Sequence, residues 1–190
     1  FIFEATGQKE WLDEAKRLVE ITFRDFYDDQ KSIFYFTAND QKDLITRTVE
    51  VHDNVIPASN SVMAKNLFRL SYLLEQPGYL QIAQKMLGLV TANMADYPSG
   101  YSNWAQLMLN LTDTHFEVAI VGENAIYLLN ELQKHYLPQV IFCAGTTENS
   151  LPLLQNRYVQ GKSLIYICQD KSCLLPVETV EMALKLINPK

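Results

Sequence analysis

Residues 11–18 read WLDEAKRL, and residues 79–86 read YLQIAQKM. Each stretch has an aromatic residue followed by leucine, then alanine, then a long apolar side chain, at helical spacings. Apolar residues at these spacings lie on one face of a helix, so both stretches predict amphipathic helices. The recurrence indicates a repeat of two helices and a loop, since stacked helical hairpins share a core that one hairpin could not bury alone. Generic helix patterning is the alternative explanation.

The surrounding sequence extends this pattern to four helices. Pro57 suits the first turn of the second helix, because its fixed φ and missing N–H are tolerated there. The predicted helices span residues 9–27, residues 57–76, residues 79–97 and a shorter stretch between Gly100 and Leu111. In the first helix, the predicted inner face consists of Trp11, Ala15, Leu18, Thr22 and Phe26, with Val19 and Phe23 beside them. Helices joined by turns predict helical hairpins over residues 1–114.

The pattern changes after residue 114. Three short runs are rich in β-branched and aromatic residues: FEVAIVG at 116–122, QVIFCAG at 139–145 and SLIYICQ at 163–169. Helical patterns at 123–136 and 177–187 separate and follow them, which predicts an α/β extension over residues 115–190 packed on the helical part. Gly122 leads straight into a helix and is compatible with a phosphate cradle, but a structural turn is favoured because the G-x-G-x-x-G spacing is absent.

Composition excludes several classes of protein. The chain has 190 residues, of which 48% are apolar, so it can bury a sizeable core. Its 16 basic and 22 acidic residues give a net charge of −6, which argues against nucleic-acid binding. The apolar runs are broken well before the ~20 residues that a membrane-spanning helix needs, so we expect no membrane insertion. The low, odd count of 3 cysteines suits a reducing compartment, and we expect a cytoplasmic protein.

The cysteines and histidines predict neither a metal site nor a cofactor. Cys168 and Cys173 are spaced too widely for the Cys-x-x-Cys redox motif, and no further pair completes a zinc site. A structural role is favoured for both, and a redox-sensing role for the tail stays open. His115 and His135 have no partner at a metal-ligand spacing, so we expect core or surface histidines.

Polar and ionisable residues concentrate in residues 35–60, YFTANDQKDLITRTVEVHDNVIPASN, between the first two predicted helices. Connections of this length on a helical scaffold are where ligand-binding side chains most often lie. We therefore expect any functional residues to gather there. The polar residues of this stretch include Thr37, Asp40, Arg47, Glu50, His52, Asp53, Asn54, Ser59 and Asn60.

Five ordered motifs give the whole chain a family resemblance. They are Phe34-Tyr35-Phe36-Thr37, Leu44-Ile45-x-Arg47, Asp53-Asn54-x-x-Pro57-x-x-Asn60-Ser61, Glu117-Val118-x-Ile120-Val121-Gly122, and Tyr166-x-Cys168-Gln169 with Cys173-x-x-Pro176. In this order they resemble the C-terminal part of the YyaL-like proteins, also known as spermatogenesis-associated thioredoxin-domain proteins. The family usually has glycine where this chain has Asn54 and Ser59. Asn tolerates a left-handed φ better than Ser does.

The resemblance implies a fold and a domain order. It implies an N-terminal thioredoxin-like domain ahead of an (α/α) toroid of the six-hairpin glycosidase and N-acylglucosamine 2-epimerase type. We therefore predict a mainly α fold, in which residues 1–114 form helical hairpins of the toroid and residues 115–190 form a small α/β tail. The chain opens FIFEATG without an initiator methionine, so we expect a fragment of a longer protein.

The resemblance also implies that substrate lies in the funnel at the toroid axis. The residues predicted to lie nearest to it supply the candidate chemistry. Asp53 and His52 suit general acid–base work on a sugar, Arg47 suits orienting the substrate, Tyr35 suits stacking on a ring, and Asn60 suits substrate binding. The structural alternative is an Arg47–Asp53 ion pair that pins the loop, with Asn60 capping the following helix.

Two functional hypotheses follow. The first is carbohydrate binding or processing by an isomerase, epimerase or glycosidase-like module. The second is a non-catalytic helical platform that positions the thioredoxin-like domain of the same full-length chain and binds a protein partner. A partial toroid exposes an apolar edge, so we also expect the fragment to self-associate.

Overall fold

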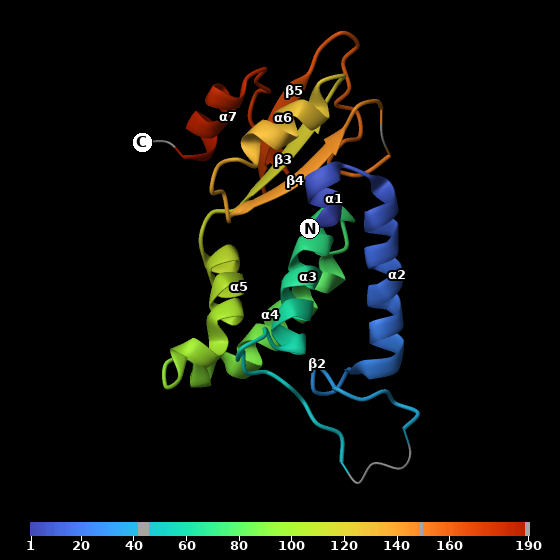
Figure 1. The fold of residues 1–190 in the computed structure, drawn as a ribbon, viewed down its shortest axis with the longest axis vertical. Coiled ribbons are helices and arrows are strands. Elements are labelled where there is room, and N and C mark those ends of the chain that lie inside the picture. The colour runs from blue at the N-terminus through green and yellow to red at the C-terminus, as the bar shows by residue number, and fades with distance from the viewer. Residues whose placement is uncertain (42–45, 149, 189–190) are drawn as a thin grey trace. The chain divides into compact units, whose positions relative to one another are not determined.

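The computed structural model describes residues 1–41, 46–148 and 150–188. In chain order, its elements are α1 (Ile2–Thr6), α2 (Lys9–Phe26), β1 (Tyr27–Asp28), β2 (Ile33–Phe34), α3 (Ser59–Leu73), α4 (Pro77–Met94), the 3-10 helix η1 (Pro98–Tyr101), α5 (Ser102–Thr112), β3 (Phe116–Val121), α6 (Ala125–Leu132), β4 (Val140–Gly145), β5 (Leu164–Gln169), β6 (Ser172–Cys173) and α7 (Val180–Ile187). Figure 1 shows these elements along the chain. Every helix of the described ranges is too short or too polar to cross a lipid bilayer.

The chain divides into two compact units, which we call the sheet unit and the helical unit. The sheet unit contains Phe1–Leu12, Tyr72–Glu75 and Thr114–Lys190, and the helical unit contains Asp13–Ser71 and Gln76–Asp113. The first helix and the end of α3 thus belong with the C-terminal strands. The predicted domain boundary at residue 114 stays a prediction, because compactness alone does not define an independently folding domain.

A four-stranded mixed sheet forms the centre of the sheet unit, with the strand order β4-β3-β5-β6. β3 and β4 are parallel and are connected through α6, whereas β5 pairs with β3 antiparallel. One face of the sheet packs against α6 and α7 (Figure 1). This core contains Val118, Ile120, Phe142, Ile165 and Ile167 of the strands together with Leu129 and Ala183 of the helices. The three predicted strands and both predicted helices of this region are therefore confirmed.

The helical unit is built from most of α2, the short β1–β2 hairpin and the helices α3, α4 and α5. Pro77 occupies the first turn of α4, where its missing N–H leaves no hydrogen bond unmade. The buried face of α4 consists of Ala83, Met86, Leu87 and Val90, as its periodicity predicts. The four helices predicted from residue 9 to residue 111 are therefore confirmed as elements, with boundaries shifted by a few residues.

The predicted inner face of α2 is partly wrong. Trp11 and Leu18 are 44% and 49% exposed, whereas the neighbouring Leu12 and Val19 are 1% and 5% exposed. The indole N–H of Trp11 donates to Gln8 Oε1 at 3.1 Å on the surface. Two apolar rows run side by side along this helix, and periodicity alone does not identify which row faces the core.

The predicted fold class is also wrong. Helices and two β-sheets, of four and two strands, make up the described part of the chain, so it is an α/β mixture and not a mainly α set of toroid hairpins. The physical reason lies in the strands, which bury a core of their own with α6 and α7. In addition, the short strands β1 and β2 lie between α2 and α3 in the chain. The repeat suggested by residues 11–18 and 79–86 stays a prediction.

Candidate functional site

Asp53 organises the predicted loop by accepting hydrogen bonds at both carboxylate oxygens. Oδ1 accepts from the backbone N–H of Ala58 at 3.0 Å and from the Ser61 hydroxyl at 2.7 Å, and Oδ2 accepts from the N–H of Asn103 at 2.8 Å. Ala58 and Ser61 lie at the start of α3, and Asn103 lies at the start of α5. Asp53 therefore caps two helices at once, where the positive ends of their dipoles also favour a negative charge. The side chain is only 5% exposed.

The backbone around Asp53 is fixed by the same elements. Its N–H donates to Gly100 O at 2.8 Å, and the indole N–H of the buried Trp104 donates to Val51 O at 2.8 Å. Next to it, His52 is exposed, and its Nε2 lies 2.8 Å from the Tyr101 hydroxyl. The imidazole ring also lies 6.5 Å from the Tyr97 ring. Of the predicted catalytic residues, His52 is thus the one that combines an exposed ring with an aromatic surrounding.

Asn60 is fully buried and bonds backbone groups through its whole amide. Oδ1 accepts from Phe34 N–H at 2.9 Å, while Nδ2 donates to Phe34 O at 2.8 Å and to Glu50 O at 2.9 Å. It therefore acts like a strand residue that pairs with β2, and not like the helix cap of the structural alternative. A substrate would have to displace bonds that already satisfy this amide.

Arg47 and Tyr35 are brought together, as the prediction of a shared site requires. The guanidinium of Arg47 lies 3.9 Å from the centre of the Tyr35 ring and donates to Asn39 Oδ1 at 2.7 Å and to Thr37 O at 2.5 Å. The ring face of Tyr35 is therefore covered by a cation of the same chain. Arg47 bonds these residues and not Asp53, so the predicted Arg47–Asp53 ion pair does not form.

Two further expectations concern the backbone of this loop. Neither Asn54 nor Ser59 has a positive φ, and Ser59 begins α3, so the chain has ordinary backbone where the family has glycine. The Leu44-Ile45 part of the family motif lies outside the described residues. The functional roles of Asp53, Arg47, His52, Tyr35 and Asn60 stay predictions.

A second polar cluster lies on the sheet face opposite to α6 and α7. Side chains alternate along a strand, so Glu117 of β3 and Cys168 of β5 share this face, and the strand register places them directly opposite each other. The next pair in the same row is Cys168 and Cys173, which are joined by a disulfide across β5 and β6. Cys168 is 1% exposed, whereas Cys173 is exposed.

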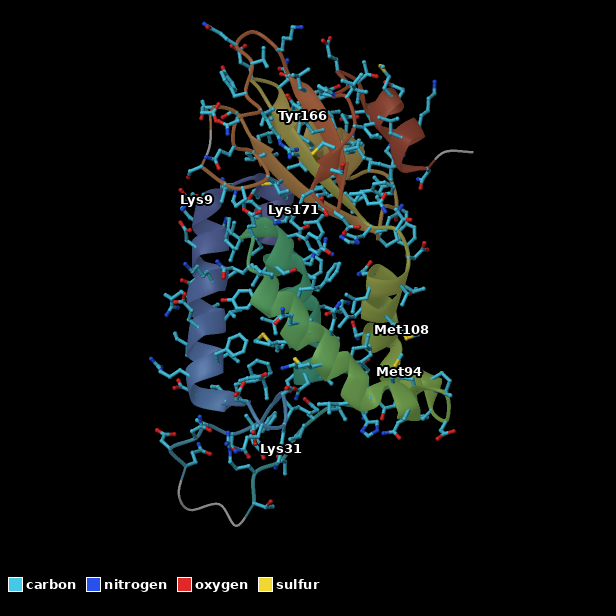
Figure 2. The ribbon with its side chains drawn as sticks, turned by 180° about the vertical axis from the view of Figure 1, so that it is seen from behind. Lys9, Lys31, Met94, Met108, Tyr166 and Lys171 are labelled. Carbon is cyan, nitrogen blue, oxygen red and sulfur yellow. A yellow bond between two sulfur atoms is a disulfide. The ribbon has the colours of Figure 1, made fainter. Side chains whose placement is uncertain are left out.

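Arg157 covers this disulfide. Its Nη1 donates to Cys168 Sγ at 3.0 Å and its Nη2 donates to Cys173 Sγ at 3.1 Å, so the planar fork contacts both sulfurs. The guanidinium lies 5.1 Å from the centre of the Tyr166 ring, and the Tyr166 hydroxyl donates to Arg157 O at 3.1 Å. Burial lowers the pKa of the Arg157 guanidinium, and the nearby Tyr166, Glu117 and Cys143 oppose this effect. Figure 2 labels Tyr166 and Lys171, which lie on this part of the sheet unit.

Further titratable residues lie between this cluster and the end of α3. Glu117 is fully buried, with Oε1 at 3.4 Å from His115 Nε2, an ion pair when the imidazole is protonated. The Tyr72 ring packs edge-on against His115 with ring centres 4.6 Å apart. Burial raises the pKa of Tyr72 to about 12, and the charges of Asp170 and Glu117 add to the effect. Titratable groups gathered in a buried region are a recognised feature of functional sites, although structural networks also produce them.

The expected structural turn at Gly122 is supported by its surroundings. Gly122 has a φ of 121°, and a Cβ there would lie 2.2 Å from Lys162 O, so only glycine allows this close approach. The N–H of Asn124, just before α6, donates to the Ser163 hydroxyl at 3.0 Å. The Ser163 hydroxyl therefore binds this N–H group, which the phosphate-cradle alternative would leave for a phosphate.

The sequence reasoning missed the Glu117, Arg157 and Cys168–Cys173 cluster. A signal for it was present in SLIYICQDKSC, because Asp170-Lys171 can form a two-residue turn that places residues 168 and 173 opposite each other. Both turn residues have positive φ, of 47° and 67°, as a type I′ turn requires. No sequence pattern identifies Arg157, which approaches the sulfurs from a loop.

The fold and the clusters together define an α/β chain with two polar centres of different kinds. No family model matches the chain. It is 24% identical over 188 residues to spermatogenesis-associated protein 20 of Rattus norvegicus, covering 93% of this chain and 24% of that protein. The human protein of the same name is 22% identical over 200 residues, covering 99% and 25%, and an uncharacterised protein of Caenorhabditis elegans is 21% identical, covering 98% and 26%.

These similarities extend over nearly the whole chain and support a relationship to spermatogenesis-associated protein 20. The chain spans about a quarter of the length of the curated relatives it matches. The names of these relatives state no activity, substrate or partner.

Proposed function

We propose that the helical unit is a non-catalytic platform that binds a thioredoxin-like domain of the same full-length protein and presents it to a protein partner. The observation that carries this proposal is Asp53, whose two carboxylate oxygens accept three hydrogen bonds from the starts of α3 and α5. A general acid or base must exchange a proton with substrate. A buried carboxylate that caps two helices is poorly suited to that exchange and well suited to holding a loop in place.

The surface beside Asp53 supports a binding role. Val55 and Ile56 are 96% and 68% exposed, directly before the start of α3. Adjacent exposed aliphatic residues on a fixed loop offer an apolar contact for another domain. We assign this contact to the thioredoxin-like domain, and we expect a cytoplasmic protein whose isolated residues 1–190 self-associate through the uncovered apolar surface. Light scattering that shows a monomer at micromolar concentration would count against that self-association.

The test places a photo-crosslinking amino acid at Val55 in the full-length protein. Crosslinks from this position to the thioredoxin-like domain, identified by mass spectrometry, are the expected result. The matched control carries the same probe at Leu175, an aliphatic residue of the sheet unit that is 88% exposed. If position 55 crosslinks no more to that domain than position 175 does, the platform proposal fails.

The second candidate function is carbohydrate binding or processing, and the exposed His52 favours it. Its imidazole contacts the Tyr101 hydroxyl and lies near the Tyr97 ring, which is a suitable surrounding for a sugar ring and a proton-transfer group. A thermal-shift screen with free and phosphorylated monosaccharides and amino sugars tests it, since ligand at a hundredfold its Kd adds about 2.7 kcal/mol to stability. A sugar-specific shift that His52→Ala abolishes would favour this candidate over the platform. The platform proposal predicts no shift with any sugar.

A further inference from the structure

We propose that Cys168 and Cys173 form a reversible dithiol–disulfide exchange site on the sheet unit, whose substrate is a dithiol in one direction and a disulfide in the other. This activity is independent of the platform role proposed for the helical unit. The argument rests on three features of the site: the unequal exposure of the two sulfur-bearing residues, the guanidinium that contacts both sulfurs, and the turn that holds them opposite each other.

The unequal exposure assigns a role to each cysteine. Cys173 is exposed on the short edge strand β6, whereas Cys168 is 1% exposed on β5. Thiol–disulfide exchange requires the incoming thiolate to reach one sulfur in line with the bond that breaks. Cys173 is therefore the sulfur that is attacked, and Cys168 is the leaving group.

Arg157 supplies the charge that this exchange needs. The electron pair of the broken S–S bond moves to Cys168 Sγ, and Nη1 of Arg157 already lies 3.0 Å from that sulfur. A fixed positive charge beside a cysteine favours its thiolate, and a better-stabilised thiolate leaves faster. Nη2 lies 3.1 Å from Cys173 Sγ, so the same guanidinium serves the second step.

The complete reaction balances with a dithiol as the second reactant. One thiolate of the dithiol attacks Cys173 Sγ, the Cys168–Cys173 bond breaks, and a mixed disulfide joins the dithiol to Cys173. The second thiolate then attacks its own partner sulfur, which closes the disulfide of the substrate and releases Cys173 as a thiolate. Two electrons pass to the protein, and the two protons lost by the dithiol balance those gained by Cys168 and Cys173. The reverse sequence oxidises the protein pair with a substrate disulfide.

The turn between β5 and β6 keeps Cys168 and Cys173 close enough for their disulfide to form again. Asp170 and Lys171 connect β5 to β6 with positive φ at both positions, and Lys171 is fixed at both ends, since its N–H lies 3.4 Å from Glu117 Oε2 and its Nζ lies 2.6 Å from Glu75 Oε1. Cysteines opposite each other in a short hairpin remain adjacent after reduction, so closure needs no large movement. A buried thiol outside this arrangement is Cys143, where burial raises the thiol pKa to about 12, and it takes no part in the exchange.

The first experiment measures exchange in the full-length protein under native conditions. Dithiothreitol is the reductant, oxidised glutathione is the oxidant, and mass spectrometry follows the peptide that contains Cys168 and Cys173. We expect Arg157→Gln to slow reduction on the order of tenfold and Arg157→Lys to lose less, because the lysine retains the charge without the fork. Arg17→Gln, at an exposed arginine of α2, is the matched control. Equal rates for Arg157→Gln and Arg17→Gln would overturn the proposal, as would reduction that occurs only in unfolding concentrations of urea.

The second experiment leaves Arg157 unchanged. It therefore still tests the proposal if the Arg157 variants do not fold. Cys168→Ser leaves the exposed Cys173 thiol alone, and Cys173→Ser leaves the buried Cys168 thiol alone. With 5,5′-dithiobis(2-nitrobenzoate), we expect Cys168→Ser to form a mixed disulfide at residue 173 at least about tenfold faster than Cys173→Ser does at residue 168, because access controls the rate. Equal rates, or faster reaction at residue 168, would overturn the assignment.

Discussion

The loop around Asp53 in the helical unit and the hairpin around Cys168 in the sheet unit use polar side chains in opposite ways. In the loop, the carboxylate of Asp53 and the amide of Asn60 bond chiefly backbone groups, so both side chains hold the chain in place. In the hairpin, the guanidinium of Arg157 contacts two sulfurs, and the carboxylate of Glu117 lies beside an imidazole. A concentration of polar residues in the sequence therefore does not by itself mark a reactive site. What matters is whether backbone groups already occupy the polar atoms.

The largest expected effect comes from removing the double cap. Asp53→Ala deprives two helix starts and the Ser61 hydroxyl of their common acceptor, and each lost cap costs about 1 kcal/mol with a further penalty for buried unsatisfied groups. We expect the free energy of unfolding to fall by about 3 kcal/mol in urea titrations. Asp96→Ala, at an exposed aspartate, is the control and should change stability by less than about 0.5 kcal/mol. If Asp53→Ala lost no more stability than Asp96→Ala, the Asp53 side chain would not hold its loop in place. The contrast between this loop and the hairpin around Cys168 would then disappear.

A somewhat smaller effect is expected at Asn60. The amide satisfies three backbone groups, two on Phe34 and one on Glu50, and Asn60→Ala leaves them without this partner. We expect a loss of about 2 kcal/mol in unfolding free energy, because part of the β2 edge can bond to water instead. Asn93→Ala, at an exposed position of α4, should be close to neutral. Retention of wild-type stability by Asn60→Ala would mean that the amide is available for a ligand after all.

Local pattern allowed the helices and strands to be predicted, but not how they combine. Helical periodicity located α2 and α4, and the runs at 116–122 and 139–145 located β3 and β4. The toroid, which the family resemblance implied, was a wrong prediction because β3, β4 and β5 form a sheet that buries a core of its own with α6 and α7. The β1–β2 hairpin was missed, since strands of two residues leave too little pattern to recognise.

The candidate sites show a similar limit. Sequence reasoning placed Asp53 and Asn60 in the candidate site, but it could not show that both are buried and bonded chiefly to backbone groups. Arg157 was not predicted, because it contacts Cys168 from the connection between β4 and β5, outside any helix or strand. Contacts between residues distant in the sequence are set by the tertiary fold, and no local pattern encodes them.

The stability of the protein at alkaline pH should depend on the buried thiol of Cys143 in the sheet unit. Burial raises the pKa of Cys143 to about 12, with a smaller contribution from Glu4. The folded chain therefore keeps a proton that the unfolded chain has lost above pH 9, so stability falls as the pH rises through this window. Between pH 8 and pH 10 we expect a loss of about 1.4 kcal/mol in urea titrations.

The Cys143→Ala variant is the control for this pH dependence. It should be less stable at pH 8 because of the lost packing, yet its stability should change less between pH 8 and pH 10. Above pH 10 the comparison becomes less specific, because burial also raises the pKa of Tyr72 in the sheet unit and of Tyr79 in the helical unit. An unchanged slope in Cys143→Ala would show that another group causes the alkaline sensitivity.

The smallest expected effect concerns the turn that sets the two cysteines opposite each other. Lys171 has a φ of 67°, a conformation that costs a non-glycine residue roughly 1 kcal/mol, and its Nζ pairs with Glu75 on the surface. Lys171→Gly and Lys171→Ala both remove the ion pair, but only glycine also removes the backbone cost. We therefore expect Lys171→Gly to be more stable than Lys171→Ala by about 1 kcal/mol, measured by urea titration with the disulfide intact. If the two variants are equally stable, the hairpin does not hold position 171 in the left-handed region, and the alignment of Cys168 with Cys173 must come from the strand pairing alone.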